Sequence, residues 1–289
     1  MKKNFILWAT TCLGLIAALC MVANAATTID AANKYAYAAN LGWMDWRGDT
    51  NNGAAIGEYI CSGYLYSANV GWINLGSGSP ANQIQYQNNS ASDFGVNHDG
   101  AGNLTGYAYG ANIGWIQFEQ TYGQPKVDLF TGKLSGSVYS ANCGWISLSN
   151  FFAFVQTTNI QKGALAPNSL PVAWLLQNFG TTNVNANADP DMDGQSTAQE
   201  YLAGTDPNNA ASVLKITSFT RDTPTPTYTI LQWNAVNTRY YVVQKRSSLN
   251  DGAWVDYVNF PLSGWSNVGL NDYNPNEFFR VRAYRPLMP

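Results

Sequence analysis

Three aspartates in one short segment are spaced as the ligands of a metal ion would be. Asp189, Asp191 and Asp193 alternate with other residues, Gly194 follows them, and Glu200 ends the segment. Alternate side chains of an extended segment can converge on one cation, and a glycine permits the sharp turn that must follow. Without a cation, carboxylates this close repel one another. The pattern D-x-D-x-D-G-x5-E predicts a loop that binds Ca²⁺, and the alternative is an acidic, solvated turn.

Calcium requires more oxygen atoms than three aspartates supply. The same template predicts that Gln195 contributes its backbone carbonyl and that Thr197 contributes its hydroxyl or a bridging water. Glu200 would supply both carboxylate oxygens from the first turn of a following helix. The predicted Ca²⁺ ligands in this loop are therefore Asp189, Asp191, Asp193, Gln195, Thr197 and Glu200.

The segment DPDMDGQSTAQEYLAGTDP, residues 189 to 207, resembles the bacterial thrombospondin type 3 repeat, and dockerin and EF-hand loops are similar. The resemblance implies a calcium-stiffened connector or interaction module in which Asp206 adds an oxygen to the same ion or to an adjacent one. Two positions depart from the family pattern. Ser196 stands where an aliphatic residue is usual, and Met192 stands where glycine is common. The segment occurs once, whereas a cohesin-binding dockerin normally needs two copies.

The loop lies in a part of the chain that predicts short helices. Between Leu170 and Gly180, large apolar side chains recur at helical spacing, with Pro171 near the start and a glycine at the end. Residues 161–211 are therefore predicted to form a helical connector that carries the calcium loop. The sequence on both sides of this connector has the alternating pattern of β-strands.

One phrase occurs four times in the N-terminal part of the chain. Its copies centre on tryptophans that are 29, 43 and 30 positions apart in the sequence. They are YAYAANLGWMDW from Tyr35, GYLYSANVGWINL from Gly63, GYAYGANIGWIQF from Gly106 and GSVYSANCGWISL from Gly136. Period-two alternation on both sides of Ala-Asn-x-Gly predicts four β-hairpins with tight turns. Residues 94–96 and 127–129 predict a further strand before some hairpins, and residues 26–160 are expected to form one four-unit β domain.

The repeated tryptophans have two interpretations. Hairpins become stable when stacked copies bury apolar side chains against one another, which favours Trp43, Trp72, Trp115 and Trp145 as core residues. The alternative is an exposed aromatic platform for sugars. Of the alternating tyrosines, two are expected on a solvent face; the candidates are Tyr64, Tyr66, Tyr107 and Tyr109. The phrase resembles the G-W-I repeat of exported bacterial surface proteins, a resemblance that implies no particular chemistry.

Residues 212–289 again have a β pattern. Residues 214–216, 228–233, 240–245 and 278–283 predict strands joined by turn residues. The phrases LQW, YYVVQKRSS and FFRVRA resemble a fibronectin type III or related module, which implies a small β-sandwich. The predicted fold class is therefore mainly β, with an antiparallel repeat domain and a small sandwich joined by a helix, calcium loop and helix.

The first residues have the pattern of an export signal. A basic start, an apolar stretch that ends at Val22 and the sequence Ala23-Asn24-Ala25 predict a signal peptide over residues 1–25, with an uncleaved membrane anchor as the alternative. No later segment is long and apolar enough to cross a membrane. The mature chain then keeps Cys61 and Cys143, either as a disulfide or as two buried free thiols.

Composition narrows the classes of partner and of function. Charged residues make up 11% of the chain, against about 25% in average soluble domains, and the net charge is −3. Nucleic acid is therefore not an expected partner. Between residues 26 and 160 only four residues are basic and eight are acidic, so the surface there must be mostly neutral and polar.

No catalytic motif is found in the sequence. The G-x-S-x-G, H-E-x-x-H, Walker and C-x-x-C patterns are absent, and the one histidine, His98, lies in a turn-like segment where we expect a solvated loop residue. A glycosidase that uses two carboxylates, such as Asp45 and Glu58, is a weaker alternative. We expect a secreted, non-catalytic structural or adhesive protein of the cell surface, extracellular space or periplasm. Its expected partners are copies of itself, other surface proteins or polysaccharide; the alternative function is carbohydrate binding through exposed aromatic residues of the repeats.

Overall fold

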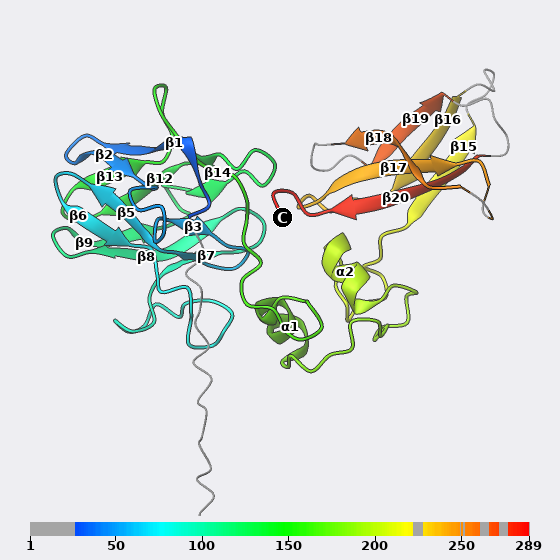
Figure 1. Cartoon of the computed structure of the whole chain (residues 1–289), viewed down its shortest axis with the longest axis horizontal. Coiled ribbons are helices and arrows are strands. Elements are labelled where there is room, and N and C mark those ends of the chain that lie inside the picture. Colours follow the sequence, from blue (N-terminus) through cyan, green and yellow to red (C-terminus); the bar gives the residue numbers. More distant parts are fainter. Residues whose placement is uncertain are drawn as a thin grey trace, which may run out of the picture.

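The four repeated phrases form four β-hairpins that join into one closed sheet. The computed structural model describes residues 27–221, 228–248, 250, 252–260, 266–271 and 277–288, so the predicted signal peptide lies outside the described residues. The hairpins are β1 (Ile29–Ala38) with β2 (Gly42–Asp45), β5 (Tyr64–Ser67) with β6 (Gly71–Asn74), β8 (Leu104–Gly110) with β9 (Gly114–Phe118), and β12 (Ser137–Ser140) with β13 (Gly144–Ser147). Successive hairpins pair antiparallel, and β13 pairs with β1 through Ser147 and Tyr37. The eight strands therefore close into a barrel (Figure 1).

Short strands outside the barrel lie between successive hairpins or follow the last one. They are β3 (Ala55–Ile56) with β4 (Cys61–Ser62), β7 (Val96–His98) against β8, β10 (Lys126–Val127) with β11 (Leu134–Ser135), and β14 (Val155–Thr157) against β1. The strands predicted at 94–96 and 127–129 correspond to β7 and β10, each displaced by one or two residues. The prediction of a further strand before some hairpins is therefore supported, and β7, β8 and β9 form a three-stranded meander.

The tryptophans lie outside the barrel, and the prediction that they form its core is wrong. Their side chains are 46–49% exposed: Trp43, Trp72, Trp115 and Trp145. The residue after each tryptophan points inward instead and is at most 2% exposed: Met44, Ile73, Ile116 and Ile146. Successive side chains of a strand point to opposite faces, so only one of the two can be inside. The interior of the eight-stranded barrel is filled by these side chains together with Trp46 and Phe118, so the four repeated tryptophans lie on the outer face.

Asparagine side chains link the hairpin turns in a ring. The asparagine of each Ala-Asn-x-Gly turn donates a hydrogen bond to the backbone carbonyl of residue x in the neighbouring turn. The bonds run from Asn69 to Leu41 (2.8 Å), Asn112 to Val70 (3.1 Å), Asn142 to Ile113 (2.8 Å) and Asn40 to Cys143 (3.1 Å). The last bond joins the first hairpin to the fourth, so the asparagine ring is closed. The repeated asparagine therefore holds the units together as well as forming the turn.

The two cysteines of the mature chain are separate buried thiols. Cys143 is residue x of the fourth turn and is 6% exposed, while Cys61 in β4 is 1% exposed. Burial raises the pKa of the Cys61 thiol to about 12, which keeps it protonated and unreactive. Of the two alternatives for these cysteines, the structure has the free thiols.

The connector contains two short helices on a small apolar core of its own. The predicted helix is α1 (Val172–Phe179), and it ends at Gly180, whose φ of 67° is the left-handed conformation common after a helix. The second helix, α2 (Thr197–Ala203), follows the acidic loop. Trp174 of α1 packs against Tyr201 of α2 with ring centroids 5.3 Å apart. This contact brings the two helices together with the acidic loop between them in the sequence.

The C-terminal region is a sandwich of two three-stranded sheets. One contains β15 (Ile216–Arg221), β16 (Tyr228–Trp233) and β19 (Asn267–Asn271); the other contains β18 (Val255–Phe260), β17 (Tyr240–Arg246) and β20 (Phe278–Tyr284). Trp233 and Leu231 from the first sheet and Tyr241 and Val243 from the second form one buried cluster. The mainly β fold class predicted from the sequence is confirmed.

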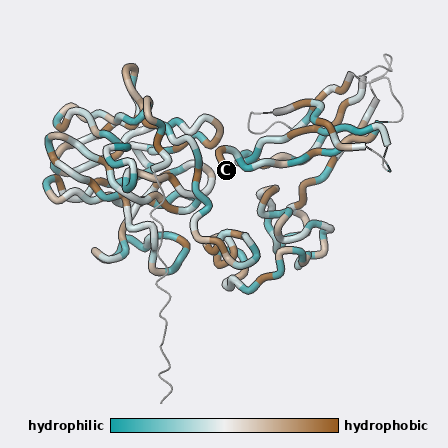
Figure 2. The backbone as a smooth tube through the Cα atoms, in the orientation of Figure 1, coloured by the Kyte–Doolittle hydropathy of each residue, from teal (hydrophilic) through white to brown (hydrophobic). Residues whose placement is uncertain are grey.

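Apolar residues are distributed over both β regions and the connector. Figure 2 shows hydrophobic and hydrophilic stretches that alternate along the strands rather than one continuous apolar segment. No helix within the described part of the chain has the length and apolar character needed to cross a membrane.

Candidate metal centre

The acidic loop brings its three aspartates together. One carboxylate oxygen each from Asp189, Asp191 and Asp193 lies within 4.8 Å of the others. The Asp189 carboxylate folds the loop, because it accepts hydrogen bonds from the backbone N–H of Gly194 at 2.9 Å and of Asp193 at 3.2 Å. Met192 and Gly194 take positive φ values of 64° and 95°, so the chain turns sharply at the point that the template requires.

Glu200 supplies a second, independent indication of a cation. Its side chain is fully buried, and within the described part of the chain neither carboxylate oxygen accepts a hydrogen bond of normal geometry, although the nearby Thr205 side chain acts to lower its pKa. One oxygen of Asp191 and one of Asp193 are likewise buried without a partner. Buried carboxylate oxygens are costly unless they are hydrogen-bonded, paired with a cation or coordinated to a metal. This donor set consists of oxygen alone and so fits a hard divalent cation.

The electrostatics of the loop agree with that description. Burial raises the pKa of Glu200 to about 7, and the neighbouring carboxylates of Asp191 and Asp193 add to the effect. Burial, together with the charge of Asp193, also raises the pKa of Asp191. These shifts mean that the carboxylates disfavour one another's charge. A divalent cation among them would reverse this penalty, because it would become the largest local charge.

The remaining predicted ligands have other contacts. Thr197 is buried, and its hydroxyl donates to the carbonyl of Ala188 at 3.1 Å, so it helps to fold the loop. The Gln195 side chain donates to the carbonyl of Leu214 at 2.7 Å, which leaves the backbone carbonyl of Gln195 as the atom that the template assigns to the ion. Asp206 is exposed outside the aspartate cluster and accepts from the backbone N–H of Asn208 at 3.1 Å.

The departure at Ser196 has a structural reason. The Ser196 hydroxyl accepts a hydrogen bond from the backbone N–H of Gln199, and the Gln199 side chain accepts one from the backbone N–H of Ser196. This capping box begins α2. It fixes the first turn of the helix, which is the turn that carries Glu200.

The residue after Glu200 is the centre of a buried polar cluster that joins all three parts of the chain. The Tyr201 hydroxyl donates to Glu58 of the barrel domain at 2.9 Å. Arg285, which follows β20, forms an ion pair with the same Glu58 carboxylate, and its guanidinium lies 4.3 Å from the centroid of the Tyr201 ring. Glu58 is 3% exposed. We call Glu58, Tyr201, Arg239 and Arg285 the junction cluster.

Arg239 attaches the sandwich to the end of α2. Its guanidinium donates to the carbonyls of Leu202 at 2.8 Å and of Tyr201 at 3.1 Å. Carbonyls in the last turn of a helix have no N–H partner within the helix, so Arg239 supplies the donor. A Cβ on Gly204 would lie 2.8 Å from the guanidinium carbon, so this close approach requires glycine. In Figure 1, α2 lies beneath β17 and β20, and α2 contacts β20.

The segment that follows β20 returns to the barrel domain. The Leu287 carbonyl accepts a hydrogen bond from the backbone N–H of Ile160 at 2.7 Å, and Leu287 and Met288 pack against the barrel core. In Figure 1 this segment lies between the two β regions. The sandwich is therefore joined to the barrel domain at two places, the junction cluster and this segment.

The two carboxylates considered for a glycosidase each have a cationic partner of their own. Asp45 pairs with Lys34 at 2.7 Å, and Glu58 pairs with Arg285. His98 is not a solvated loop residue as predicted: it lies in β7, is 1% exposed, and its Nδ1 donates to the Gly57 carbonyl at 2.8 Å. The prediction failed because the residues that follow His98 are typical of turns, although His98 itself is the last residue of β7.

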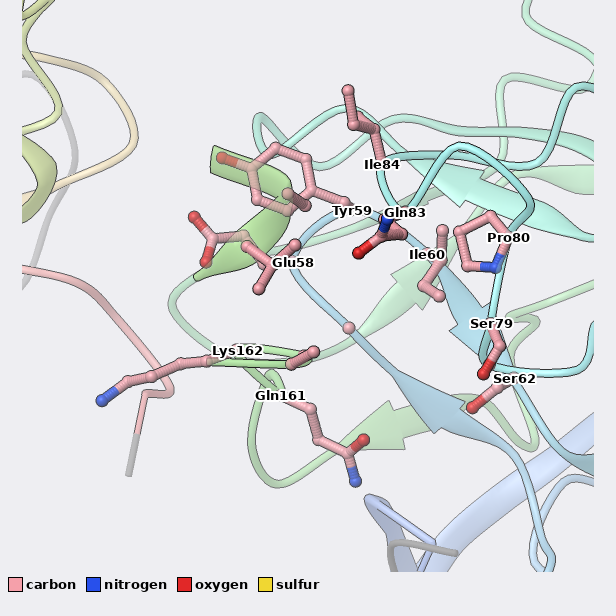
Figure 3. A pocket seen from close by; sticks show the side chains of 16 residues that line it. Glu58, Tyr59, Ile60, Ser62, Ser79, Pro80, Gln83, Ile84, Gln161 and Lys162 are labelled. Carbon is pink, nitrogen blue, oxygen red and sulfur yellow. The ribbon is translucent and has the colours of Figure 1, made fainter. Parts of the chain in front are cut away.

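A cavity of about 300 Å³ lies where the barrel domain meets the connector. Glu58 and Lys162 extend to one side of it, and Ser62 and Ser79 lie at the opposite side (Figure 3). Glu58 is the only acidic residue among those that line the cavity, and it is already bound to Tyr201 and Arg285. Its contacts give it a structural role in the junction cluster.

Sequence reasoning found the acidic loop but missed the junction cluster. The loop is a contiguous pattern, whereas Glu58, Arg239 and Arg285 stand far apart in the sequence. Arg285 is also one of three arginines at the end of the chain, with Arg280 and Arg282, and nothing in the sequence distinguishes it from them. Glu58 alone gave a signal: no charged residue stands between Asp49 and Asp93 except Glu58, and an isolated charge becomes buried only with a partner.

Comparison of the chain with protein-family models, with curated proteins and with solved structures finds no match.

Proposed function

We propose that this chain is an exported, non-catalytic structural or adhesive protein in which Ca²⁺ stabilises the connector between two β domains. The observation that carries the proposal is the fully buried Glu200 carboxylate, which has no hydrogen bond of normal geometry among the described residues and whose pKa is raised by burial and by the charges of the aspartate cluster. A calcium ion coordinated by Asp189, Asp191, Asp193 and Glu200 would compensate these charges.

The position of α2 explains how one ion could stiffen the whole chain. Glu200 and Tyr201 are adjacent in α2, so the turn that would bind the ion also carries the ring and the carbonyl that the junction cluster uses. With the ion absent, mutual repulsion of the carboxylates opposes this turn. With the ion bound, α2 is fixed, and Glu58, Arg239 and Arg285 retain their partners. The domains would then be displayed in one arrangement.

The test is calorimetric titration of the mature protein, residues 26–289, with Ca²⁺. We expect one site, with a Kd in the range of about 10⁻⁴–10⁻³ M that is usual for extracellular modules. At a free Ca²⁺ concentration ten times the Kd, the stability should rise by about 1.4 kcal/mol, and a chelator should abolish the gain.

Three variants make the titration specific. Asp191→Ala and Glu200→Ala should remove both the heat of binding and the gain in thermal stability. Asp206→Asn is the matched control, because Asp206 is exposed, unlike Glu200, and its carboxylate accepts a hydrogen bond from the backbone N–H of Asn208. The absence of heat in the wild type, or unchanged binding in Glu200→Ala, would contradict the proposed site.

Carbohydrate binding is the second candidate function, and the exposure of the repeated tryptophans favours it. Each tryptophan lies against a tyrosine of its own hairpin, with ring centroids 4.9–5.1 Å apart, and about half of each indole is exposed. Four aromatic pairs therefore surround the barrel on its outer face. A lectin-like protein should show quenching of tryptophan fluorescence by sugar, whereas a self-assembling subunit should form oligomers or filaments at raised concentration.

A further inference from the structure

One of the four aromatic pairs, Tyr109 with Trp115 in the third hairpin, has a further aromatic ring beside it from a neighbouring loop, which we call the wall. The connection between β6 and β8 is the longest between hairpins, and its residues 77–95, which we call the Phe94 loop, reach the third hairpin. Phe94 stands at 86° to the ring of Trp115, with centroids 5.0 Å apart, and also contacts Tyr109 at 6.3 Å. Tyr107 flanks Trp115 at 6.1 Å and 76°. The half-exposed indole of Trp115 therefore offers one face to a ligand, and the rings of Phe94 and Tyr107 stand nearly perpendicular to it at its sides.

The Phe94 loop is held in place by buried polar contacts. Its Tyr86 is 3% exposed, accepts a hydrogen bond from Gly78 N–H at 2.6 Å and donates to the Cys61 carbonyl at 3.2 Å. The Asn88 side chain accepts from Gly95 N–H at 2.9 Å, and the Gly95 carbonyl in turn accepts from Tyr107 N–H in β8 at 3.1 Å. Because these bonds fix the loop against the barrel, the wall is formed before any ligand arrives, which lowers the entropic cost of binding.

The space between loop and hairpin is a cavity of about 470 Å³. Phe94, Tyr107 and Trp115 line it on the aromatic side, and Asn89 and Ser90, both exposed, lie on the polar side. None of the described residues that line it carries a charge. The volume is within the usual range for small-ligand sites of about 300–1,000 Å³.

We infer that this cavity is a binding subsite for a neutral pyranose unit of a polysaccharide, an inference that rests on the second candidate function. A sugar ring has an apolar face of C–H groups, which suits the electron-rich face of an indole, and a rim of hydroxyls, which suits amide and hydroxyl side chains. Uronic acids and sulfated sugars would lack a cation to pair with, and a nucleic acid would lack one for its phosphates.

The other three tryptophans provide the comparison that the inference needs. Among the described aromatic rings, those beside Trp43 and Trp72 are the tyrosines of their own hairpins. In the fourth hairpin Ser137 occupies the position that corresponds to Tyr107, so Trp145 lies beside Tyr139 alone. Only Trp115 combines an aromatic wall with a polar loop. Trp43 is therefore a matched control, with the same residue type, exposure and hairpin position.

The experiment is calorimetric titration of the mature protein with four neutral hexasaccharides, namely cellohexaose, xylohexaose, mannohexaose and chitohexaose, and with hexagalacturonate as the charged counterpart. At least one neutral sugar should bind. Trp115→Ala should weaken its affinity about tenfold or more, as truncation of a central aromatic contact usually does. Phe94→Ala should weaken it as well, whereas Trp43→Ala should change it by less than about twofold. Near-ultraviolet circular dichroism and thermal unfolding report whether each variant is folded.

The outcomes separate the subsite from the broader function. If no neutral hexasaccharide binds, both the subsite and the candidate carbohydrate function fail, while the calcium proposal is unaffected. If a sugar binds but Trp43→Ala and Trp115→Ala weaken it equally, the aromatic surface binds sugar and the subsite is overturned. Binding of hexagalacturonate alone would overturn the assignment to neutral sugars.

Discussion

His98, the one histidine of the chain, is held in its neutral form by its surroundings. It is 1% exposed, its Nδ1 donates to the Gly57 carbonyl, and its Nε2 has no hydrogen-bond partner. Burial lowers its pKa below the usual 6.5, although the Gly57 carbonyl and the nearby Asp99 carboxylate act in the opposite direction. Glu58, Arg239 and Arg285 line the small cavity beside it, and Arg285 is paired with Glu58. A proton on this ring is therefore unfavourable in the folded state.

Acid should destabilise the protein partly through this residue. Since the pKa of His98 is lower in the folded state than in the unfolded state, its contribution to stability is present above pH 6.5 and is lost as the pH falls through the folded-state value. His98→Asn retains a donor for the Gly57 carbonyl and does not titrate. With saturating Ca²⁺, urea unfolding between pH 7 and pH 5 should show a smaller loss of stability in the variant than in the wild type. Equal losses would show that His98 does not carry this effect.

The tryptophans show what residue patterns can and cannot predict. Alternation with period two indicated strands, and it required the tryptophan and the next residue to point to opposite faces. It left open which face is the interior. That choice depends on the closure of eight strands, because the small closed interior is already filled by side chains such as Met44, Trp46 and Ile73. Closure of the barrel is a property of the four hairpins together, so the sequence of a single hairpin does not predict it.

At the scale of the elements, the asparagine ring should stabilise each contact between hairpins about equally. The four bonds have the same donor, the same type of acceptor and distances of 2.8–3.1 Å. Asn69→Ala and Asn142→Ala should each lower the free energy of unfolding by about 1 kcal/mol, because each leaves a backbone carbonyl without its partner. Chemical unfolding measures this directly.

A control for the ring is an asparagine that lies outside it. Asn51→Ala changes an exposed residue of a turn and should alter the stability by less than about 0.5 kcal/mol. If the ring variants behave like Asn51→Ala, the asparagines serve only the local turn.

The helices of the connector show that structure is predictable where its signals lie close together in the sequence. The helix α1 was predictable because its signals, namely apolar spacing, a proline near the start and a glycine after the end, lie within a single short stretch. The acidic loop was predictable for the same reason. The capping role of Ser196 was not, because in the family pattern the position appeared as a departure, and the reciprocal bonds with Gln199 became visible only once α2 was formed.

At the scale of the whole molecule, the buried ion pair of Glu58 and Arg285 should hold the sandwich to the barrel domain. Burial lowers the pKa of Arg285 to about 9, yet the guanidinium still pairs with Glu58 and stacks on Tyr201. Glu58→Gln retains an acceptor for the Tyr201 hydroxyl but leaves the Arg285 charge without its partner. The cost should be about 3 kcal/mol or more, with faster proteolytic cleavage of the connector.

Asp45→Asn provides the matched comparison for that variant. Asp45 pairs with Lys34 within the barrel domain, and both side chains are more exposed than Glu58. Its loss should cost about 1 kcal/mol or less and should leave cleavage of the connector unchanged. If Glu58→Gln has no larger effect than Asp45→Asn, the junction cluster does not hold the domains together.

Long-range pairing limited prediction of the molecule as a whole. Composition and periodicity were sufficient for the mainly β class. The contact between Glu58 and Arg285 joins residues that are 227 positions apart, and no local pattern marks either one. The four-unit repeat indicated that the hairpins associate, whereas the pairing of β13 with β1 depends on the sum of small strand twists around the sheet.

The asparagine ring also sets an order of events during synthesis. The bond from Asn40 reaches Cys143, so the first hairpin has no neighbour on one side until the fourth has been made. A chain that leaves the ribosome or a translocon from its N-terminus would carry β1 as an open edge throughout that interval, with backbone groups free to recruit a strand from another copy. The fourth hairpin, which emerges last, thus covers the open edge of β1 and protects the first hairpin from aggregation.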